Sequence, residues 1–240
     1  MNRVWIITKR ELSGFFDSLI AYVMIILFLG LSGSFTWLFG TNVFMLGQAN
    51  LSIFYDIAFW SLFFFIPAIT MRMIAEENKS GTIELLITKA VSDGQIVLGK
   101  FLACLILVLV ALLCTIPYYI TISQLGNVDD GGVIGGYLGM ILLAGSYISI
   151  GLFASSLTQN QIVAFLIALF IGIFFHMIFD VIGSGLTGSL GELFNFLSMR
   201  THVESLSRGV IDTRDIIYFL SIILVGLVGT QIMLSKRNWK

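Results

Sequence analysis

Residues 96–122 read IVLGKFLACLILVLVALLCTIPYYITI and contain one charged side chain, Lys100. A helix needs about 20 mostly apolar residues to cross the hydrocarbon core of a bilayer, so this stretch is long enough to span a membrane and to tilt or bend within it. We expect a bend at Pro117, because proline lacks the backbone N–H that a helix uses. The stretch predicts a helix, since an isolated strand in lipid would leave its backbone groups unpaired.

The rest of the chain has the same character. Hydrophobic residues make up 58% of the 240 residues, charged residues make up 11%, and 21 residues are phenylalanine. This composition excludes a soluble globular fold and predicts an all-α polytopic membrane protein, with one transmembrane domain over residues 1–240. The other five predicted spans are 19–39, 57–74, 133–157, 162–182 and 216–234.

Residues 1–18 predict an amphipathic helix that lies in the membrane interface before the first span. Apolar side chains share one face of its helical wheel and charged side chains share the opposite face. Such a helix lies in the headgroup plane with its apolar face toward the lipid tails; a frayed tail is the alternative. The apolar face carries Trp5, Leu12, Phe15, Phe16 and Leu19, and the opposite face carries Arg3, Arg10 and Asp17.

The distribution of Lys and Arg predicts the orientation. Cytoplasmic segments of membrane proteins are enriched in these residues, so both termini and the loop after the second span are expected in the cytoplasm. Ten of the 13 Lys and Arg residues lie on that side: Arg3, Lys9 and Arg10; Arg72, Lys79, Lys89 and Lys100; Lys236, Arg237 and Lys240. The other side has Arg200, Arg208 and Arg214.

Residues 76–89, EENKSGTIELLITK, form a charged segment between two apolar spans. Gly81 permits a sharp reversal of the chain, and the residues from Thr82 onward can form a short amphipathic helix. A helix of this kind docks in the groove of a partner protein through apolar anchors and charged rims; the alternative is a helix that rests on lipid headgroups. The candidate docking residues are Glu76, Glu77, Gly81, Thr82, Glu84, Leu85 and Leu86.

Residues 94–100, GQIVLGK, have the spacing of a phosphate-binding P-loop. Phe101, however, occupies the place of the Ser or Thr that ligates magnesium. Ser92 and Gln95 instead predict a capping box that begins a helix. We therefore expect no catalytic residue, nucleotide site, cofactor or metal site in this chain, and the absence of a basic tract argues against nucleic acid as a partner.

Two groups of residues inside the spans are candidates for function. His176 and Asp180 have the i, i+4 spacing of a proton relay or half a metal site, or they have a helix-capping or packing role. Gly131, Gly135 and Gly139 form a small face that lets helices approach closely, either within the chain or between subunits.

Residues 183–215 predict a re-entrant or interfacial hairpin that roofs the outer mouth.

These features in this order resemble the membrane subunit of ABC transporters of the ABC-2 (exporter) type. The resemblance rests on Ala75–Glu77, Gly81–Leu86, Val91–Ser92 and Val97–Lys100. In this order they follow the family's acidic, Gly-Thr-Leu-Glu-Leu-Leu and Leu-Gly-Lys signature, with Ile83 and Ile87 as departures. Residues 15–23, 66–72, 151–158 and 207–215 further resemble the gliding-motility-associated ABC transporter permease subunit.

The resemblance implies that the segment after Gly81 is a coupling helix that docks on a separate ATPase, which holds ATP and magnesium. It also implies a bacterial cytoplasmic (inner) membrane and an auxiliary membrane subunit with a large extracytoplasmic domain, or a second copy of the chain. A secondary transporter or channel that works without an ATPase is the main alternative. It would need paired charged residues near the middle of the membrane and internal repeats, and neither is evident in the spans.

Overall fold

The computed structural model describes residues 3–40, 43–81 and 92–237, which form helices joined by turns, with no strand in these ranges. Six helical segments are long and apolar enough to cross a membrane, so the chain is an all-α polytopic membrane protein, as predicted. In chain order the helices are α1 (Arg3–Asp17), α2 (Ile20–Trp37), α3 (Val43–Leu46), α4 (Ser52–Thr70), α5 (Ala75–Ser80), α7 (Asp93–Leu113), α8 (Ile116–Leu125), α9 (Asp130–Ser156), α10 (Gln161–Ile173), the π-helical η1 (Phe174–Ile178), α11 (Phe179–Gly185), α12 (Ser189–Leu197), α13 (Met199–Ser207) and α14 (Thr213–Arg237).

Side-chain caps define where several helices begin. The predicted capping box before α7 is confirmed: the N–H of Gln95 donates to Oγ of Ser92, and the N–H of Ser92 donates to Oε1 of Gln95, both at 3.3 Å. Asp129 and Asn160 each accept a hydrogen bond from the backbone N–H two residues later, at the starts of α9 and α10. These contacts satisfy N–H groups that have no partner inside the helix.

The third span bends where the proline predicts. α7 ends at Leu113, α8 begins at Ile116, and Pro117 lies in the first turn of α8. The break precedes the proline because the missing N–H and the ring disturb the carbonyl four residues earlier, that of Leu113. The hydroxyl of Thr115 donates to the carbonyl of Leu112 at 2.6 Å and so satisfies one backbone group at the break.

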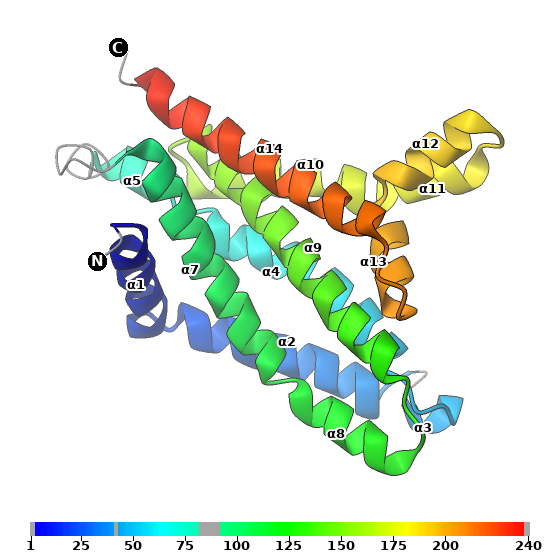
Figure 1. The fold of residues 1–240 in the computed structure, drawn as a ribbon. Coiled ribbons are helices and arrows are strands. Elements are labelled where there is room, and N and C mark those ends of the chain that lie inside the picture. The colour runs from blue at the N-terminus through cyan, green and yellow to red at the C-terminus, as the bar shows by residue number, and fades with distance from the viewer. Residues whose placement is uncertain (1–2, 41–42, 82–91, 238–240) are drawn as a thin grey trace.

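α9 is the centre of the bundle. It is buried along most of its length and packs against α4, α7, α10, α13 and α14 (Figure 1). Small residues allow α14 to lie close to it: a Cβ added at Gly226 would lie 2.7 Å from Oγ of Ser149, and one at Gly145 would lie 2.8 Å from Ile223. Close approach through small residues is the usual way in which membrane helices pack.

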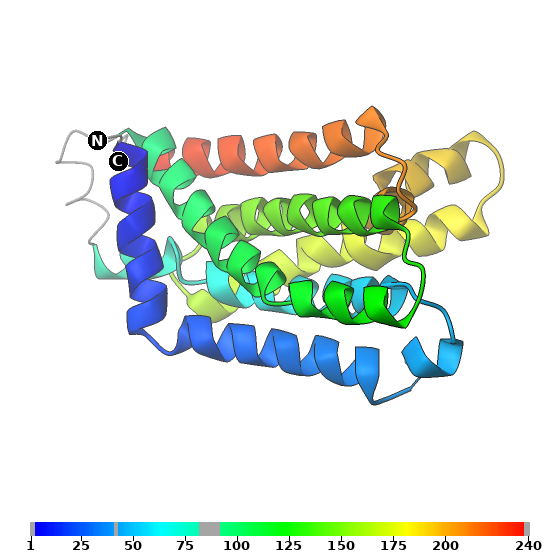
Figure 2. The same cartoon turned by 60° about the horizontal axis from the view of Figure 1, so that its bottom comes forward.

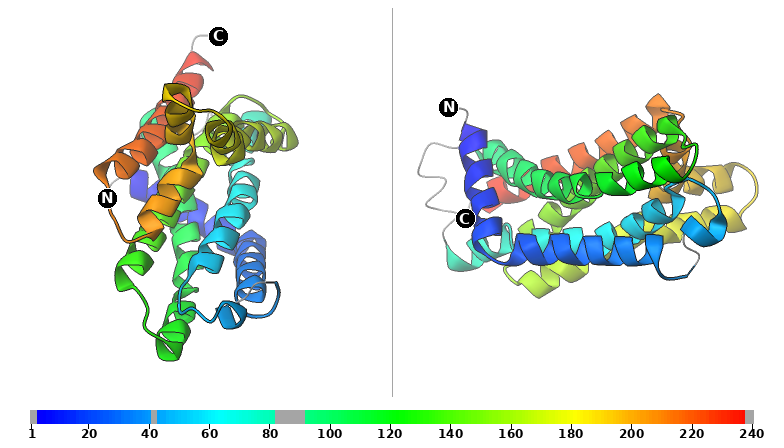
Figure 3. Two further views of the ribbon diagram at one scale, coloured as in Figure 1. Left: turned by 90° about the vertical axis from the view of Figure 1, so that its right-hand side faces the viewer. Right: turned by 90° about the horizontal axis from the view of Figure 1, so that it is seen from below.

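The two ends of the bundle differ. α1, α5, the start of α7 and the end of α14 gather at one end (Figure 2). We call this the terminal end. The opposite end carries α3, the turn between α8 and α9, and α11 to α13 (Figure 3), and we call it the hairpin end.

α1 lies across the terminal end of the bundle (Figure 2). Its buried face differs from the predicted one. Phe15 is 1% exposed and packs into the bundle, whereas Trp5 and Leu19 are 52% and 76% exposed. The prediction that all these side chains face the membrane is wrong for Phe15, because α1 packs on the bundle through Phe15, Ile7 and Thr8.

The predicted hairpin over residues 183–215 contains the end of α11, α12, α13 and the start of α14. α11 continues the direction of the fifth span through η1, and α12 returns along α11 (Figure 1). Because α11 carries on along the span, this pair projects beyond the bundle and does not roof it, in contrast to the expectation. α13 instead turns back and packs on α9.

Candidate functional site

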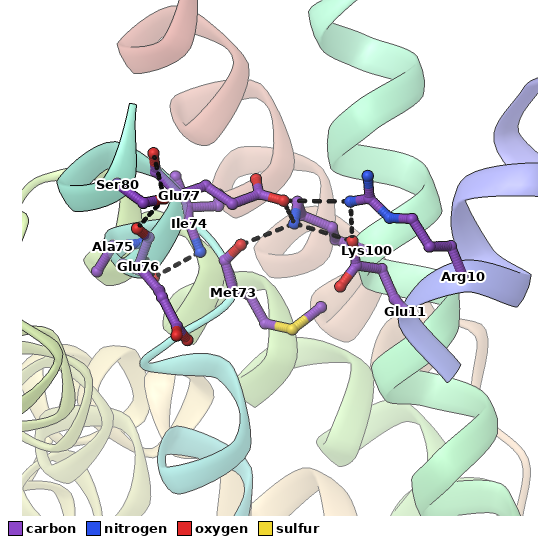
Figure 4. A network of polar contacts seen from close by, with 10 residues as sticks. Arg10, Glu11, Met73, Ile74, Ala75, Glu76, Glu77, Ser80 and Lys100 are labelled. Carbon is purple, nitrogen blue, oxygen red and sulfur yellow. Dashed lines mark hydrogen bonds and ion pairs between the residues drawn. The ribbon is translucent and has the colours of Figure 1, made fainter. Parts of the chain in front are cut away.

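A lysine is buried near the start of the third span. The side chain of Lys100, on the second turn of α7, is 1% exposed. Its Nζ lies 2.9 Å from Oε1 of Glu77 and 3.2 Å from Oε1 of Glu11, and it donates a hydrogen bond of 2.8 Å to the carbonyl of Met73 (Figure 4). An ammonium group has three N–H donors, so each has an acceptor, as a buried charge requires.

Arg10 covers this lysine from the surface. Its Nη2 contacts Oε1 of Glu11 and lies 3.2 Å from Oε1 of Glu77 (Figure 4). With its side chain 49% exposed, Arg10 contributes less to stability than the buried Lys100. We call Arg10, Glu11, Glu77 and Lys100 the Lys100 cluster; it balances two cations with two carboxylates and joins α1, α5 and α7.

The charges of the cluster change the acidity of Glu11. Burial raises the pKa of Glu11, but the charges of Lys100 and Arg10 and the hydrogen bonds from both outweigh burial and lower this pKa below its ordinary value of 4.5. The folded structure therefore stabilises the carboxylate form, and the attraction to Lys100 holds α1 against α7.

A serine on α9 fixes the turn between α4 and α5. Oγ of Ser155 accepts hydrogen bonds from the N–H groups of Ile74 (3.1 Å) and Ala75 (3.0 Å), and it donates to the carbonyl of Met71 (2.9 Å). One hydroxyl thus uses its donor and both lone pairs on three backbone groups. Since buried backbone groups need partners, this contact anchors the start of α5 to α9.

α5 leads from this anchor into the charged segment. Glu76 and Glu77 lie in its first turn, where the partial positive charge of a helix N-terminus favours carboxylates. The helix ends at Gly81, whose φ of 70° is a left-handed conformation that favours glycine. The other predicted docking residues, Thr82, Glu84, Leu85 and Leu86, lie outside the described residues.

α1 and α7 pack closely beside the cluster. A Cβ added at Gly99 would lie 2.7 Å from Cγ2 of Ile7, and the hydroxyl of Thr8 donates to the carbonyl of Gly99 at 3.1 Å. A cleft of about 340 Å³ lies between α1, α5 and α7, and on its wall the guanidinium carbon of Arg72 lies 5.6 Å from the ring centroid of Phe15. Charge, close packing and a cation–π contact therefore hold α1 to the bundle.

The predicted glycine face on α9 packs within the chain. A Cβ added at Gly135 would lie 2.1 Å from the carbonyl oxygen of Leu206, and one at Gly139 would lie 3.5 Å from Cβ of Leu206. Near Gly131, a Cβ would lie 3.9 Å from Cα of Gly209. The sequence left two uses of this face open, packing within the chain and association of subunits. The described contacts are of the first kind and are made with α13 and the turn that follows it.

His176 and Asp180 do not meet. Nδ1 of His176 lies 2.6 Å from the hydroxyl of Tyr147 on α9, and its buried Nε2 has no hydrogen-bond partner among the described residues. His176 lies in the π-helical turn η1, and its imidazole ring stacks on the rings of Phe59 and Phe63 on α4. In the described ranges, no three His, Cys, Asp or Glu residues are arranged to hold a metal ion.

Sequence reasoning missed three residues that anchor the charged segment. It counted Lys100 among the cytoplasmic charges and in the family signature but gave it no partner, gave Glu11 no part in a site, and gave Ser155 no role. A lone charge in an apolar run is a signal for a buried partner. The partners themselves come from α1 and α5, and the spacing of residues along one helix carries no information about them.

Comparison with known proteins identifies the family. A search of the curated proteins finds no match to the chain. The family described as ABC-2 family transporter protein matches residues 42–223, which is more than half of the chain. The match includes Glu77 and Lys100 of the cluster, and it also includes α9 and Ser155. The chain therefore belongs to the ABC-2 transporter family, whose members are membrane permeases that generally work with an ABC ATPase.

Proposed function

We propose that this chain is the membrane-spanning subunit of an ABC-2 exporter in a bacterial cytoplasmic membrane, and that a separate ATPase attaches to the segment after Gly81. In this orientation the terminal end faces the cytoplasm. The count of Lys and Arg supports it, because Arg10, Arg72 and Lys100 lie at the terminal end and Arg200 and Arg208 lie at the hairpin end.

The observation that carries the proposal is the anchoring of both ends of residues 82–91. The segment begins after α5, which Ser155 ties to α9, and it ends before α7, which Lys100 ties back to Glu77. A force on this segment therefore acts on α7 directly, on α1 through Glu11, and on α9 through Ser155. Such an arrangement suits a relay that moves several spans together.

In the proposed mechanism, closure of two ATPase subunits around ATP moves two such segments and rocks two membrane bundles between discrete arrangements. ATP and Mg²⁺ belong to the ATPase, and this chain supplies no catalytic group. The second bundle is another copy of the chain or an auxiliary membrane subunit with a large extracytoplasmic domain. The resemblance of residues 15–23 and 207–215 to the gliding-motility-associated permease supports assignment to that subtype.

The experiment is gentle purification of the tagged chain from native membranes, followed by identification of the proteins that accompany it. We expect an ABC ATPase with the wild-type chain and its loss with the double variant Glu84→Lys, Leu85→Asp. The matched control is Glu192→Lys, Leu193→Asp, which makes the same changes at an exposed Glu-Leu pair on α12 and should retain the ATPase. A lone chain that transports in proteoliposomes without ATP would instead establish the secondary transporter or channel.

A further inference from the structure

The two histidines of the chain, His176 and His202, have similar surroundings. They are 1% and 4% exposed, and each ring stacks on an aromatic neighbour at a centroid distance of 4.0 Å. Their hydrogen-bond partners differ, however, and the partners determine how many protons each ring needs.

His202, on α13, lies between two acceptors. Its Nε2 is 2.8 Å from the carbonyl oxygen of Phe196, and its Nδ1 is 2.6 Å from Oδ1 of Asp215 on α14. A carbonyl has no proton to donate, so Nε2 must carry a hydrogen. In a neutral imidazole Nδ1 is then bare, and its lone pair would face a carboxylate oxygen. The contact at 2.6 Å is attractive only with a further proton between the two atoms.

The surroundings favour a charged pair at this position. Asp215 is 5% exposed and lies in the first turn of α14, where the helix N-terminus stabilises a carboxylate. Its Oδ2 is buried and has no hydrogen-bond partner in the described part of the chain. A buried carboxylate with one free oxygen needs a compensating charge nearby, and protonated His202 provides it.

Other titratable groups lie around α13. α12 presents the neutral carbonyl of Phe196 to His202, and α14 presents Asp215 and Tyr218, whose hydroxyl donates to the carbonyl of Leu197 at 2.5 Å. The charge of a protonated ring is therefore balanced by Asp215. Near α13, Arg200 pairs with Glu204 at 2.7 Å, lies 3.9 Å from Asp56 on α4 and interacts electrostatically with Asp180 on α11. Arg208 donates to the carbonyl of Glu204 at 3.3 Å, and His176 on η1 is hydrogen-bonded to Tyr147 on α9.

We propose that His202 and Asp215 form a proton-binding site, which holds one proton beyond those of a neutral imidazole and a carboxylate. The bound proton ties α13 to α14 at the hairpin end, and the bond from Nε2 adds α12 to the same contact. Loss of the proton leaves two lone pairs facing each other and releases α13. The contact between α13 and α14 responds to the pH on the outer side of the membrane. The assignment of the hairpin end to the outer side rests on the proposed function, whereas the proton-binding site does not.

His176 provides a matched contrast within the same chain. The hydroxyl of Tyr147 can donate to Nδ1 of His176, and the described residues place no acceptor at Nε2. A neutral ring makes the hydrogen bond to Tyr147, and no second acceptor beside the ring favours a further proton. The two histidines are thus expected to differ in protonation at the same pH, although both are buried.

The first test is nitrogen NMR of the full chain in nanodiscs, with ¹⁵N in its histidine rings and with His176→Gln to assign the signals. At neutral pH we expect His202 with both ring nitrogens protonated and His176 with one. A neutral His202 beside a protonated carboxyl, seen as an infrared carbonyl band that Asp215→Asn removes, also places the extra proton in the site. A neutral His202 without that band overturns the proposal. Neither outcome depends on the ATPase.

The second test is hydrogen exchange of residues 199–207 as a function of pH, corrected for the intrinsic effect of pH on exchange. We expect protection in the wild type to be lost as the His202 signal changes to the neutral form. Asp215→Asn should remove this dependence, because an amide can donate to a bare Nδ1 at any pH. Arg200→Gln, which breaks an exposed pair on the same helix, should retain it. Protection that stays constant while His202 loses its proton would overturn the tie between α13 and α14.

Discussion

Nζ of Lys100 and Oε1 of Glu77 lie 2.9 Å apart, and this contact joins the start of the third span to the short helix that follows the second. The residues between them in the chain include the segment to which we assign ATPase attachment. The same lysine contacts Glu11 on α1, so one ammonium group connects three helices at the terminal end. We therefore expect Lys100 to contribute more to stability than any other residue of the cluster.

Replacement of Lys100 by methionine should destabilise the protein strongly. Methionine keeps most of the apolar stem, but the change leaves Glu11 and Glu77 without their buried cation. Removal of one partner from a buried ion pair costs about 3–5 kcal/mol. Thermal unfolding in nanodiscs measures the loss, and Arg10→Gln is the control, because loss of a half-exposed partner costs about 1 kcal/mol or less. Equal effects of the two changes would contradict the assignment of the buried charge to Lys100.

The stability contributed by Glu11 should depend on pH. Because folding lowers the pKa of Glu11, its contribution is fully present above the ordinary value of 4.5 and is lost as the pH falls through the lower value of the folded state. The unfolding free energy of the wild type should therefore exceed that of Glu11→Gln at pH 7, and the difference should shrink below about pH 4.5. In a Lys100→Met background this dependence should weaken, since burial alone would raise the pKa of Glu11 and the charge of Lys100 does most to lower it. If the stability difference between the wild type and Glu11→Gln instead grew as the pH fell, the lowered pKa of Glu11 would be contradicted.

Two adjacent serines on α9 allow a contact that anchors another segment to be compared with a hydrogen bond inside the helix. Ser155→Ala removes the partner of three backbone groups at the α4–α5 turn and should cost about 1–3 kcal/mol. Ser156→Ala removes a bond to Phe153 within the same helical turn and should change stability by about 0.5 kcal/mol or less. We also expect Ser155→Ala, and not Ser156→Ala, to weaken the coupling of ATP hydrolysis to this chain. Similar ATPase stimulation in both variants would count against a route through α9.

Two helical glycines should respond in opposite directions to alanine. At Gly135 a Cβ would lie 2.1 Å from a backbone oxygen of Leu206, so the helices must separate, at a cost of about 1–3 kcal/mol. At Gly14 no heavy atom of the described chain lies within 4 Å of the added Cβ, and alanine should stabilise α1 by about 0.5–1 kcal/mol. Thermal unfolding of the two variants measures these effects. A Gly135→Ala variant as stable as the wild type would show that α9 and α13 are not packed this closely.

Local chemistry made part of this fold predictable. The spans follow from apolar length, the start of α7 follows from Ser92 and Gln95, and the break before α8 follows from Pro117. Each of these signals acts within a few residues of the chain. The bilayer imposes helices wherever such stretches are long enough.

Contacts between distant segments were not predictable in the same way. The burial of Phe15 depends on α1 packing against other helices, and Lys100 meets Glu11 across 89 positions of sequence. His176 lies in a π-helical turn and contacts Tyr147 on α9, a partner that its i, i+4 spacing to Asp180 does not indicate. A one-helix pattern carries no information about partners on other helices.

The most direct measurement is photo-crosslinking in native membranes, with a photoreactive amino acid at Leu85. We predict a crosslink to an ABC ATPase that depends on this position, with no ATPase crosslink from the same amino acid at Leu193 on α12. Crosslinks from Leu85 to lipid alone, in a preparation where the ATPase still accompanies the chain, would contradict attachment at this segment.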